Sequence, residues 1–212
     1  ISDSILDEII RHDSMARVGC ETFATTNKVV IGGEVGFTNN TEISRLSEIV
    51  SGIVRSAVKE IGYEQDGFHW KNLDIVNLIH QQSPDIAQGV DRDGAGDQGI
   101  MFGYAVDETP ELMPAPLQYS QAILKRLSIA RRNELKGILG PDSKSQLTIR
   151  YKDGRPSSIK SIVVSTQHFD EKLSSKEVRD IISPYINEVI PSDWLVPETV
   201  WHVNPTGKFV VG

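Results

Sequence analysis

The spacing of apolar residues switches along the chain between a helical and a strand period, and this restricts the fold more than any other feature. Across residues 42–61, apolar side chains recur every three or four positions, which predicts a long amphipathic helix with Thr41 as cap and Gly62 as stop. A later helix would begin at Ser174, with Glu177 completing a capping box. The predicted helices cover residues 1–10, 42–61, 117–135 and 174–189.

Alternation of apolar and polar residues predicts β-hairpins between these helices. The first strand would turn Val18 and Cys20 inward, with Phe23 as a further candidate, and Thr26-Asn27 would form the hairpin turn. Gly32-Gly33 would close the second strand. The predicted strands cover residues 16–26, 28–31, 73–80, 146–151, 159–166, 201–203 and 208–211, with the last two pairing with each other.

Helices and hairpins in this order predict an α+β fold, because a strictly alternating βαβ chain would not place hairpins side by side in sequence. A length of 212 residues allows one or two domains. Residues 26–32 (TNKVVIG) are similar to residues 206–212 (TGKFVVG), which is a sign of internal duplication.

The charge balance restricts the possible partners. The chain has 22 Lys and Arg against 29 Asp and Glu, a formal charge of −7, which disfavours a broad nucleic-acid-binding face. A polyphosphate substrate would therefore need local Lys and Arg or bound metal. A single cysteine, Cys20, favours a reducing cytoplasm. The lack of an apolar run of about 18 residues disfavours a membrane partner, as the charge balance disfavours nucleic acid.

Residues 81–99 have no apolar period and contain four glycines and four aspartates, so we expect a loop. Glycines allow a backbone to approach a ligand and to move as a hinge. Asp97, held between small residues, could bind an ammonium group. The alternatives are an acidic surface loop or a calcium loop, although the spacing does not match an EF-hand.

Two further segments carry carboxylates at predicted strand ends. Glu34 follows Gly32-Gly33 and would face either a cleft or solvent. In Pro141-Asp142-Ser143-Lys144, Lys144 could pair with phosphate while Asp142 accepts from a sugar hydroxyl or a base amine. An ordinary turn with a surface ion pair fits the second segment equally well.

Three more features leave their role open. Phe209 could stack on a purine with Lys208 near its phosphates, or it could simply be a core residue. Glu21 needs a cation or a donor if it faces inward and has no assigned role if it faces outward. The five histidines are scattered singly and are interpreted as structural, with His168 the least clear.

Taken in order, the motifs resemble one family, the S-adenosylmethionine synthetases (methionine adenosyltransferases), in its bacterial form. The resemblance spans the whole chain, and the glycine-rich and Gln-Ser-Pro-Asp-Ile motifs are its most specific parts. The matching segments are Ala16-Arg17-Val18-Gly19-Cys20-Glu21, Gly32-Gly33-Glu34, Gln82-Ser83-Pro84-Asp85-Ile86, Gly94-Ala95-Gly96-Asp97-Gln98-Gly99-Ile100-Met101-Phe102-Gly103-Tyr104-Ala105, Leu112-Met113-Pro114-Ala115-Pro116, Pro141-Asp142-Ser143-Lys144-Ser145-Gln146, Ser165-Thr166-Gln167-His168 and Asn204-Pro205-Thr206-Gly207-Lys208-Phe209-Val210-Val211-Gly212.

The resemblance implies a fold of three similar α+β domains around a pseudo-threefold axis, about two of which are present here. It divides the chain into a partial N-terminal domain (1–83), a mobile gate with linker (84–98) and a partial central domain (99–212). It also implies the reaction of ATP with L-methionine, in which sulfur attacks ribose C5′ and triphosphate leaves and is hydrolysed. Mg²⁺ and K⁺ are the implied cofactors, and the implied partner is a second copy, in a homodimer with shared active sites and commonly a homotetramer.

The resemblance also implies roles for individual residues. Glu34, Gln82 and Asp97 are similar to the methionine-binding set, and Glu21 to the K⁺ ligand. Asp142, Ser143, Lys144, Lys208 and Phe209 are similar to the ATP-binding residues, with Lys144 in the catalytic role on the phosphates. The family usually has Arg where this chain has Lys208, so the charge remains but the bidentate fork is lost.

Some family segments have no counterpart in residues 1–212: a Gly-His-Pro-Asp-Lys segment, a glycine-rich Asp and Arg-Lys segment, and the C-terminal domain. The gate is also shorter than in the family, and the segment after Glu34 is longer. We therefore expect these residues to be part of a longer protein and to be inactive and poorly soluble alone. A non-catalytic homologue that acts as a binding or regulatory partner remains the alternative.

Overall fold

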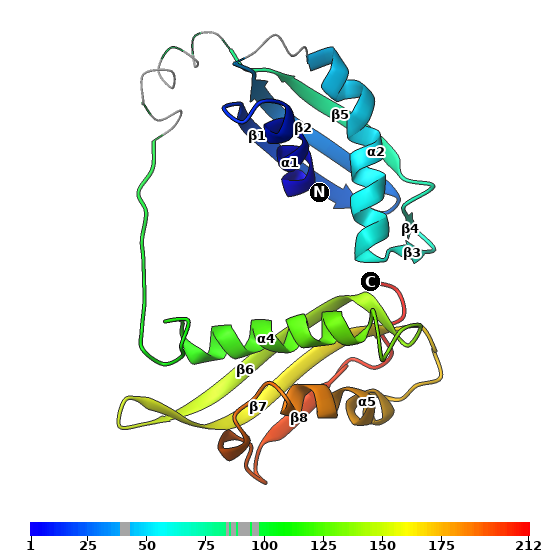
Figure 1. The fold of residues 1–212 in the computed structure, drawn as a ribbon. Coiled ribbons are helices and arrows are strands. Elements are labelled where there is room, and N and C mark those ends of the chain that lie inside the picture. Colours follow the sequence, from blue (N-terminus) through cyan, green and yellow to red (C-terminus); the bar gives the residue numbers. More distant parts are fainter. Residues whose placement is uncertain (39–42, 84, 86–87, 89–93, 95–97) are drawn as a thin grey trace. The chain divides into compact units, whose positions relative to one another are not determined.

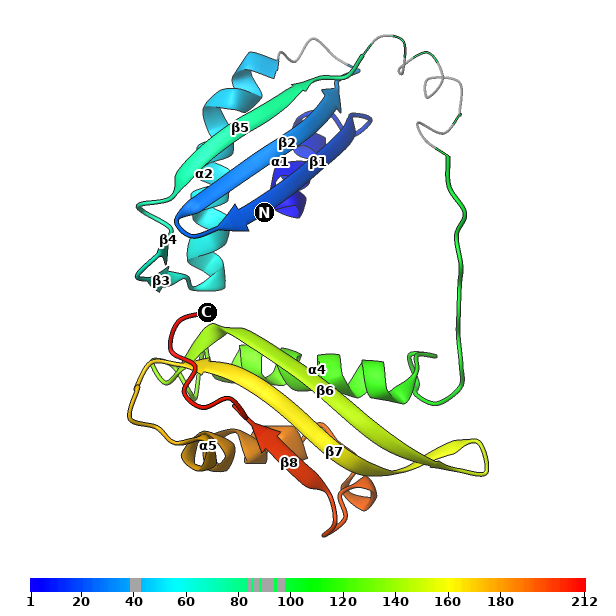
Figure 2. The ribbon, with the colours of Figure 1, turned by 180° about the vertical axis from the view of Figure 1, so that it is seen from behind.

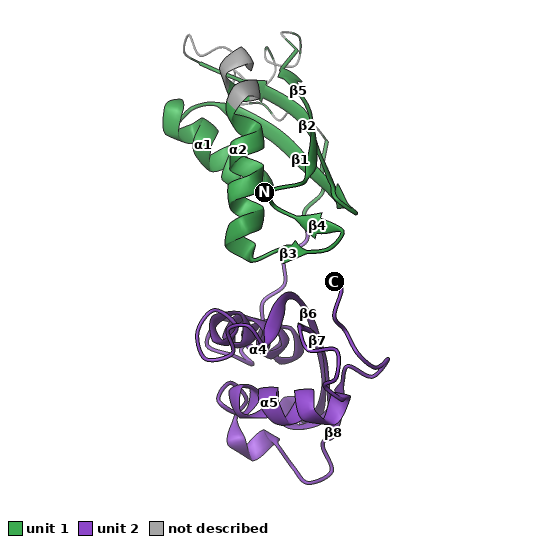
Figure 3. Cartoon of the chain, turned by 90° about the vertical axis from the view of Figure 1, so that its right-hand side faces the viewer, with its two compact units in different colours: residues 1–101 green, residues 102–212 purple. Residues whose placement is uncertain are grey.

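The computed structural model describes residues 1–38, 43–83, 85, 88, 94 and 98–212. The chain forms two compact units, residues 1–101 and residues 102–212 (Figure 3), and each is described by itself. Within the described residues, no helix combines the length and the apolar character that crossing a bilayer requires.

Unit 1 is a three-stranded sheet with two helices on one face (Figures 1 and 2). Its elements are α1 (Ser2–His12), β1 (Arg17–Thr25), β2 (Lys28–Gly36), α2 (Ile43–Ile61), β3 (Glu64–Gln65), β4 (Phe68–His69) and β5 (Asp74–Gln81). β1 and β2 form the antiparallel hairpin, and β5 returns parallel to β2, so the order is β1-β2-β5. The core between helices and sheet includes Ile5, Ile9, Val29, Ile31, Val35, Val50, Val54 and Val58.

The other face of this sheet is open within unit 1. Successive strand residues point to opposite faces of a sheet. Val18 and Cys20 pack on the helix side, so Phe23, an odd number of residues from each, points to the open side. The Phe23 side chain is 65% exposed, and Leu78 on β5 is 59% exposed. The inward position considered for Phe23 is therefore wrong, because it has the opposite parity to Val18 and Cys20.

The glycine pair does not close β2. The strand runs through Gly32 and Gly33 to Gly36, opposite residues 17–25 of β1. Gly33 has φ 127°, and a Cβ atom there would overlap the carbonyl oxygen of Gly19. Glycine is required here because two backbones approach closely, and the strand continues beyond it.

Unit 2 repeats the arrangement with a longer hairpin. Its elements are α4 (Ala115–Ala130), β6 (Leu139–Lys152), β7 (Arg155–His168), α5 (Ser175–Asn187), a 3₁₀ turn η1 (Ser192–Trp194) and β8 (Val200–Val203). β6 and β7 are antiparallel, and β8 runs parallel to β7. Both helices again cover one face (Figures 1 and 2), over a core that includes Ile123, Leu127, Leu147, Ile162, Val164, Val178, Ile182 and Ile186.

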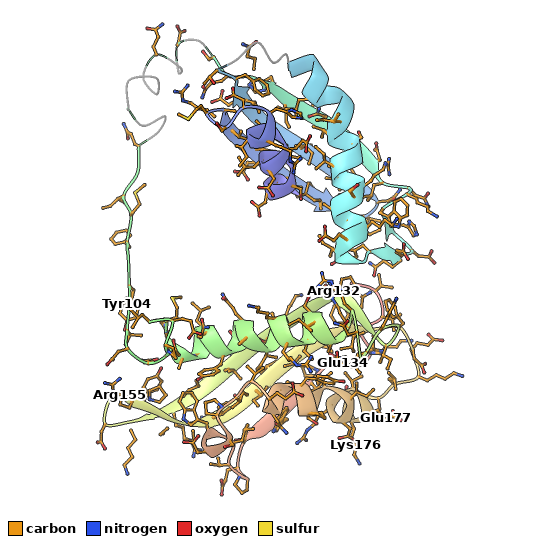
Figure 4. All side chains as sticks on the ribbon, in the orientation of Figure 1. Tyr104, Arg132, Glu134, Arg155, Lys176 and Glu177 are labelled. Carbon is orange, nitrogen blue, oxygen red and sulfur yellow. The ribbon has the colours of Figure 1, made fainter. Side chains whose placement is uncertain are left out.

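The predicted capping box of α5 is confirmed. The Ser174 hydroxyl accepts from the Glu177 N–H at 3.3 Å, and the Glu177 carboxylate accepts from the Ser174 N–H at 2.8 Å. Glu177 lies in the first turn of α5 (Figure 4). The helix predicted to end at residue 135 is α4, which ends instead at Ala130 and is followed by turns.

The β6–β7 hairpin holds the segment that enters α4. Arg155, at the hairpin turn (Figure 4), forms a two-pronged ion pair with Asp107, with both N–O distances 2.9 Å. Glu108 Oε2 accepts from the Tyr151 hydroxyl at 2.7 Å and from the Ala115 N–H at 2.8 Å. Glu108 therefore caps α4, which has no side-chain cap from its own N-cap residue.

The two units share the order helix, hairpin, helix, parallel strand, and this confirms the predicted α+β fold of repeated hairpin and helix elements. The sequence similarity that suggested duplication does not mark equivalent places. Residues 26–32 form the β1–β2 turn and the start of β2, whereas residues 206–212 follow β8. The repeat is therefore visible in the topology and not in those seven residues.

Candidate functional site

Unit 1 brings together two of the predicted methionine-binding residues. Glu34 lies inside β2, and Gln82 follows the last residue of the neighbouring strand β5, where its N–H donates to the Val35 carbonyl at 3.0 Å. The Gln82 side-chain Nε2 donates to Glu34 Oε1 at 3.4 Å. Both side chains are half-buried, so neither is a solvated turn residue.

The same pair leaves a hydrogen-bond acceptor unused. Gln82 Oε1 is buried, and among the described residues it has no hydrogen-bond partner. A Cβ on Gly36 would lie 2.9 Å from this oxygen, so Gly36 leaves it room. A buried amide oxygen without a donor costs about 1–3 kcal/mol, and beside a carboxylate it suits an ammonium group.

Asp97, the third predicted residue of this set, lies outside the described residues, as does most of the predicted gate at residues 84–98. The structure therefore neither joins it to nor separates it from Glu34 and Gln82.

In unit 2 the predicted ATP-binding residues of β6 lie in or next to an irregular stretch of strand pairing. The pairing of β6 with β7 shifts between Leu139 and Ser143, so Asp142 lies in the irregular stretch. β-Bulges, which are one form of such irregularity, redirect side chains at functional edges. Ser143 shares a hydrogen bond of 2.8 Å with the Thr166 hydroxyl, and both line a cavity of ≈ 170 Å³. The Lys144 side chain is exposed.

The tail after β8 lies beside this segment but does not form a strand. Phe209 N–H donates to His168 Nε2 at 3.1 Å, and the His168 N–H donates to the Phe209 carbonyl at 2.9 Å. Lys208 is exposed, with its Nζ 3.4 Å from Glu171. The predicted pairing of residues 208–211 with 201–203 is wrong, because β8 pairs with β7 and the tail is held largely by side chains.

Gln167 joins the tail to the β6 segment. Its Nε2 donates to the Val210 carbonyl at 2.9 Å, and its Oε1 accepts from the Asp142 N–H at 3.3 Å. The tail's last residue also meets this segment, since a Cβ on Gly212 would lie 2.8 Å from the Asp142 Cβ. The structure thus brings Asp142 and the tail together, and Phe209 is half-buried beside them, outside both hydrophobic cores.

Sequence reasoning gave no role to Gln167 and left His168 open. Both side chains are completely buried. Their position in the motif Ser165-Thr166-Gln167-His168 at the end of a predicted strand was the available signal, because polar residues that continue an apolar strand need partners when buried.

Glu21 lies on the open face of the unit 1 sheet, on the same side as Phe23, and is exposed. It is therefore not a buried carboxylate that requires a cation. In the described part of the chain, no three His, Cys, Asp or Glu side chains lie close enough together to hold a metal ion.

Comparison with protein families identifies both units. A family model described as the N-terminal domain of S-adenosylmethionine synthetase matches residues 1–84, and one described as the central domain matches residues 92–209. The S-adenosylmethionine synthase of Jannaschia sp. (strain CCS1) is 57% identical over 217 residues, which cover 100% of this chain and 55% of that protein. Those of Cereibacter sphaeroides and Paracoccus denitrificans are each 55% identical over 212 residues, with the same coverage.

The chain thus spans about half the length of the curated relatives it matches. Two consecutive domain models and more than half of all positions identical cannot arise from a shared fold alone, and the chain belongs to the S-adenosylmethionine synthetase family.

Proposed function

We propose that the full-length protein forms S-adenosylmethionine from ATP and L-methionine. The observation that carries the proposal is the similarity of the whole chain to proteins named S-adenosylmethionine synthase. In the reaction, the methionine sulfur attacks ribose C5′, and the C5′–O bond breaks to release triphosphate. Water then hydrolyses the triphosphate to phosphate and pyrophosphate.

Glu34 and Gln82 would hold the methionine ammonium group, and Asp97 would complete the set. The support is the unused acceptor Gln82 Oε1 on a side chain that is hydrogen-bonded to the Glu34 carboxylate, since a cation needs acceptors of this kind. Sulfur is already nucleophilic, so these residues are not needed as bases. Their contribution would be to align the sulfur with C5′, which can supply a large part of a rate enhancement.

Lys144 would stabilise the charge that develops on the departing triphosphate, with Lys208 adding a second cation. Asp142 and Ser143 would accept from or donate to the nucleoside, and Phe209 would stack on the adenine. The support is that the Asp142 segment and the tail lie together, with the exposed Lys144 two residues from Asp142. Fixed cations at a developing charge are often the largest catalytic contribution.

We propose Mg²⁺ and K⁺ as the ions of this reaction, in keeping with the family to which the chain belongs. Such ions would neutralise polyphosphate in an acidic protein. Among the described residues, no three His, Cys, Asp or Glu side chains lie close enough together to hold a metal ion by themselves. We therefore assign no step of the reaction to a metal held by these residues.

A homodimer in the cytoplasm, with dimers paired into a homotetramer, is part of the same proposal. Phe23 and Leu78 on the open face of the unit 1 sheet support it, since exposed apolar side chains on a sheet are commonly covered in an assembly. The mass of the full-length protein in solution, measured by light scattering, would test this.

The reaction is tested by supplying the full-length protein with ATP, L-methionine, Mg²⁺ and K⁺ and measuring S-adenosylmethionine by mass spectrometry. We expect Lys144→Met to lower kcat by at least about 100-fold, the scale of losing one charge-stabilising group. Lys152→Met, at the far end of the same strand, is the matched control and should stay near wild type. Binding of both substrates without any product from the wild-type protein would contradict the proposal and indicate a non-catalytic homologue.

A further inference from the structure

We infer that Gln167 and His168 are positioning residues that hold the tail at residues 208–210 against the Asp142 segment and so fix Phe209 for ATP. The inference rests on the proposed function, because the tail and the Asp142 segment are its ATP-binding parts. Neither side chain is given a contact with substrate.

The described hydrogen bonds of these two buried side chains go to the tail and to the segments beside it. Both are completely buried at the end of β7, where Thr166 is buried as well. Buried polar side chains are almost always paired, and most pair with backbone. The bonds described for Gln167 go to the backbone of residues 142 and 210, and those for His168 to the backbone of residues 170 and 209.

His168 binds both backbone polar groups of Phe209. Its own N–H donates to the Phe209 carbonyl at 2.9 Å, and its Nε2 accepts from the Phe209 N–H at 3.1 Å. Nε2 must be unprotonated to accept. The proton is therefore on Nδ1, which lies 2.9 Å from the Asp170 carbonyl and donates to it. The ring nitrogen of His168 thus accepts the Phe209 N–H in the way that a backbone carbonyl would in a regular strand pairing.

Gln167 couples the tail to β6 because its amide oxygen bonds to β6 and its amide nitrogen bonds to the tail. Its Oε1 takes the N–H of Asp142, and its Nε2 reaches the carbonyl of Val210. Gly140 makes room for it, since a Cβ there would overlap the Gln167 Cδ and Oε1. A movement of Gln167 would therefore displace Asp142 and the tail together.

This arrangement matters because little else that is described fixes residues 208–210. Lys208 and Val211 are exposed, and the chain reaches them through Gly207, which has φ 108°. Phe209 can present its ring in one place only if its backbone is fixed. Misplacement of a substrate by about 1 Å can cost about 100-fold in rate.

The test compares two substitutions of His168 in the full-length protein. His168→Gln keeps an acceptor near the Nε2 position, and His168→Asn keeps only a donor near the Nδ1 position. For His168→Asn we expect amide hydrogen exchange of Phe209 to accelerate by at least about 10-fold and KM for ATP to rise by a similar factor, the equivalent of about one hydrogen bond. His168→Gln should stay within about 3-fold of wild type in both, because it retains that bond.

Ile162→Val is the stability control, because it weakens the core under the same strand without removing a bond to the tail. It should lower the melting temperature and leave KM for ATP unchanged. The inference is overturned if the Phe209 amide exchanges its hydrogen equally fast in the two His168 variants. It is also overturned if exchange accelerates in His168→Asn while KM for ATP does not change.

Failure of the proposed function gives a different result. In that case the wild-type protein forms no S-adenosylmethionine, while the exchange difference between the two variants persists. The role of His168 in holding the tail would then stand, and its link to ATP would be overturned.

Discussion

Asn204 should be the residue of unit 2 whose side-chain amide contributes most to stability. It follows the last residue of β8, and its side chain continues the pairing with β7. Asn204 Oδ1 accepts from the Thr166 N–H at 2.8 Å, and Nδ2 donates to the Thr166 carbonyl at 3.1 Å. Thr166 is completely buried, and Asn204 is 2% exposed, so water cannot readily replace either bond.

The expected cost of Asn204→Ala follows from these contacts. Two buried backbone groups would lose their partners, at about 1–3 kcal/mol each. Asn204 also has φ 42°, a left-handed conformation that costs alanine about 1–2 kcal/mol. The sum is about 3–8 kcal/mol, a large part of the 5–15 kcal/mol that typically holds a domain folded.

The assay is urea unfolding of the chain in a Trp70→Phe background, so that fluorescence comes from Trp194 and Trp201 in unit 2. Asn204→Asp should fall between wild type and Asn204→Ala, because it retains the acceptor for the Thr166 N–H. It also remains measurable if the alanine variant does not fold.

A matched control separates strain from hydrogen bonding. Asn27, in the β1–β2 turn, has φ 50°, and its exposed side chain has no hydrogen bond among those given for the described residues of unit 1. Asn27→Ala, measured with Trp70 intact, should therefore cost only the strain, about 1–2 kcal/mol. A loss for Asn204→Ala no greater than that for Asn27→Ala would refute the assignment.

Three further outcomes are expected. Gly52→Ala should raise the free energy of unfolding of unit 1 by about 0.5–1 kcal/mol in urea titrations, because Gly52 lies inside α2 and a Cβ there meets no atom within 4 Å. Gly140→Ala should destabilise unit 2 by about 1–3 kcal/mol, and less when combined with Gln167→Ala, in a double-mutant cycle. Partial burial and the hydrogen bond to Glu108 raise the pKa of Tyr151 to about 12, so the stability from this bond should be present below pH 10 and lost as pH rises towards 12. Ultraviolet titration of tyrosinate should show that the ionisation lost in Tyr151→Phe is a late one.

The sequence predicted the elements well where local chemistry decides them. The helices follow the apolar period, the α5 capping box follows from Ser174 and Glu177, and Thr26-Asn27 forms the predicted turn. Local rules failed where a second segment decides. Gly33 looked like a strand end, but it serves the close approach of β1 to β2. The 208–211 segment looked like a strand, but β7 already pairs with β8, and side chains of β7 bind the tail.

For the site, the sequence identified residue types but not their neighbours. Glu34 and Gln82 are 48 positions apart and meet only because β5 returns parallel to β2. Gln167 could not be assigned from spacing, since two of its partners are backbone groups of Asp142 and Val210, and backbone groups carry no sequence signal. Glu21 could have faced either way, and strand parity places it on the open side.

The repeated topology makes the unused acceptor in unit 1 informative. Gln82 follows β5 just as Asn204 follows β8, and each donates its N–H to the middle strand, to Val35 at 3.0 Å and to Val164 at 2.9 Å. The Asn204 amide uses both of its polar atoms on Thr166. The Gln82 amide uses one, on Glu34, and buries the other without a partner among the described residues. Because the same scaffold satisfies an amide fully at the equivalent place in unit 2, the fold itself does not force the unpaired oxygen. A ligand that supplied the missing donor would explain it, which is consistent with the proposal that Gln82 and Glu34 receive an ammonium group.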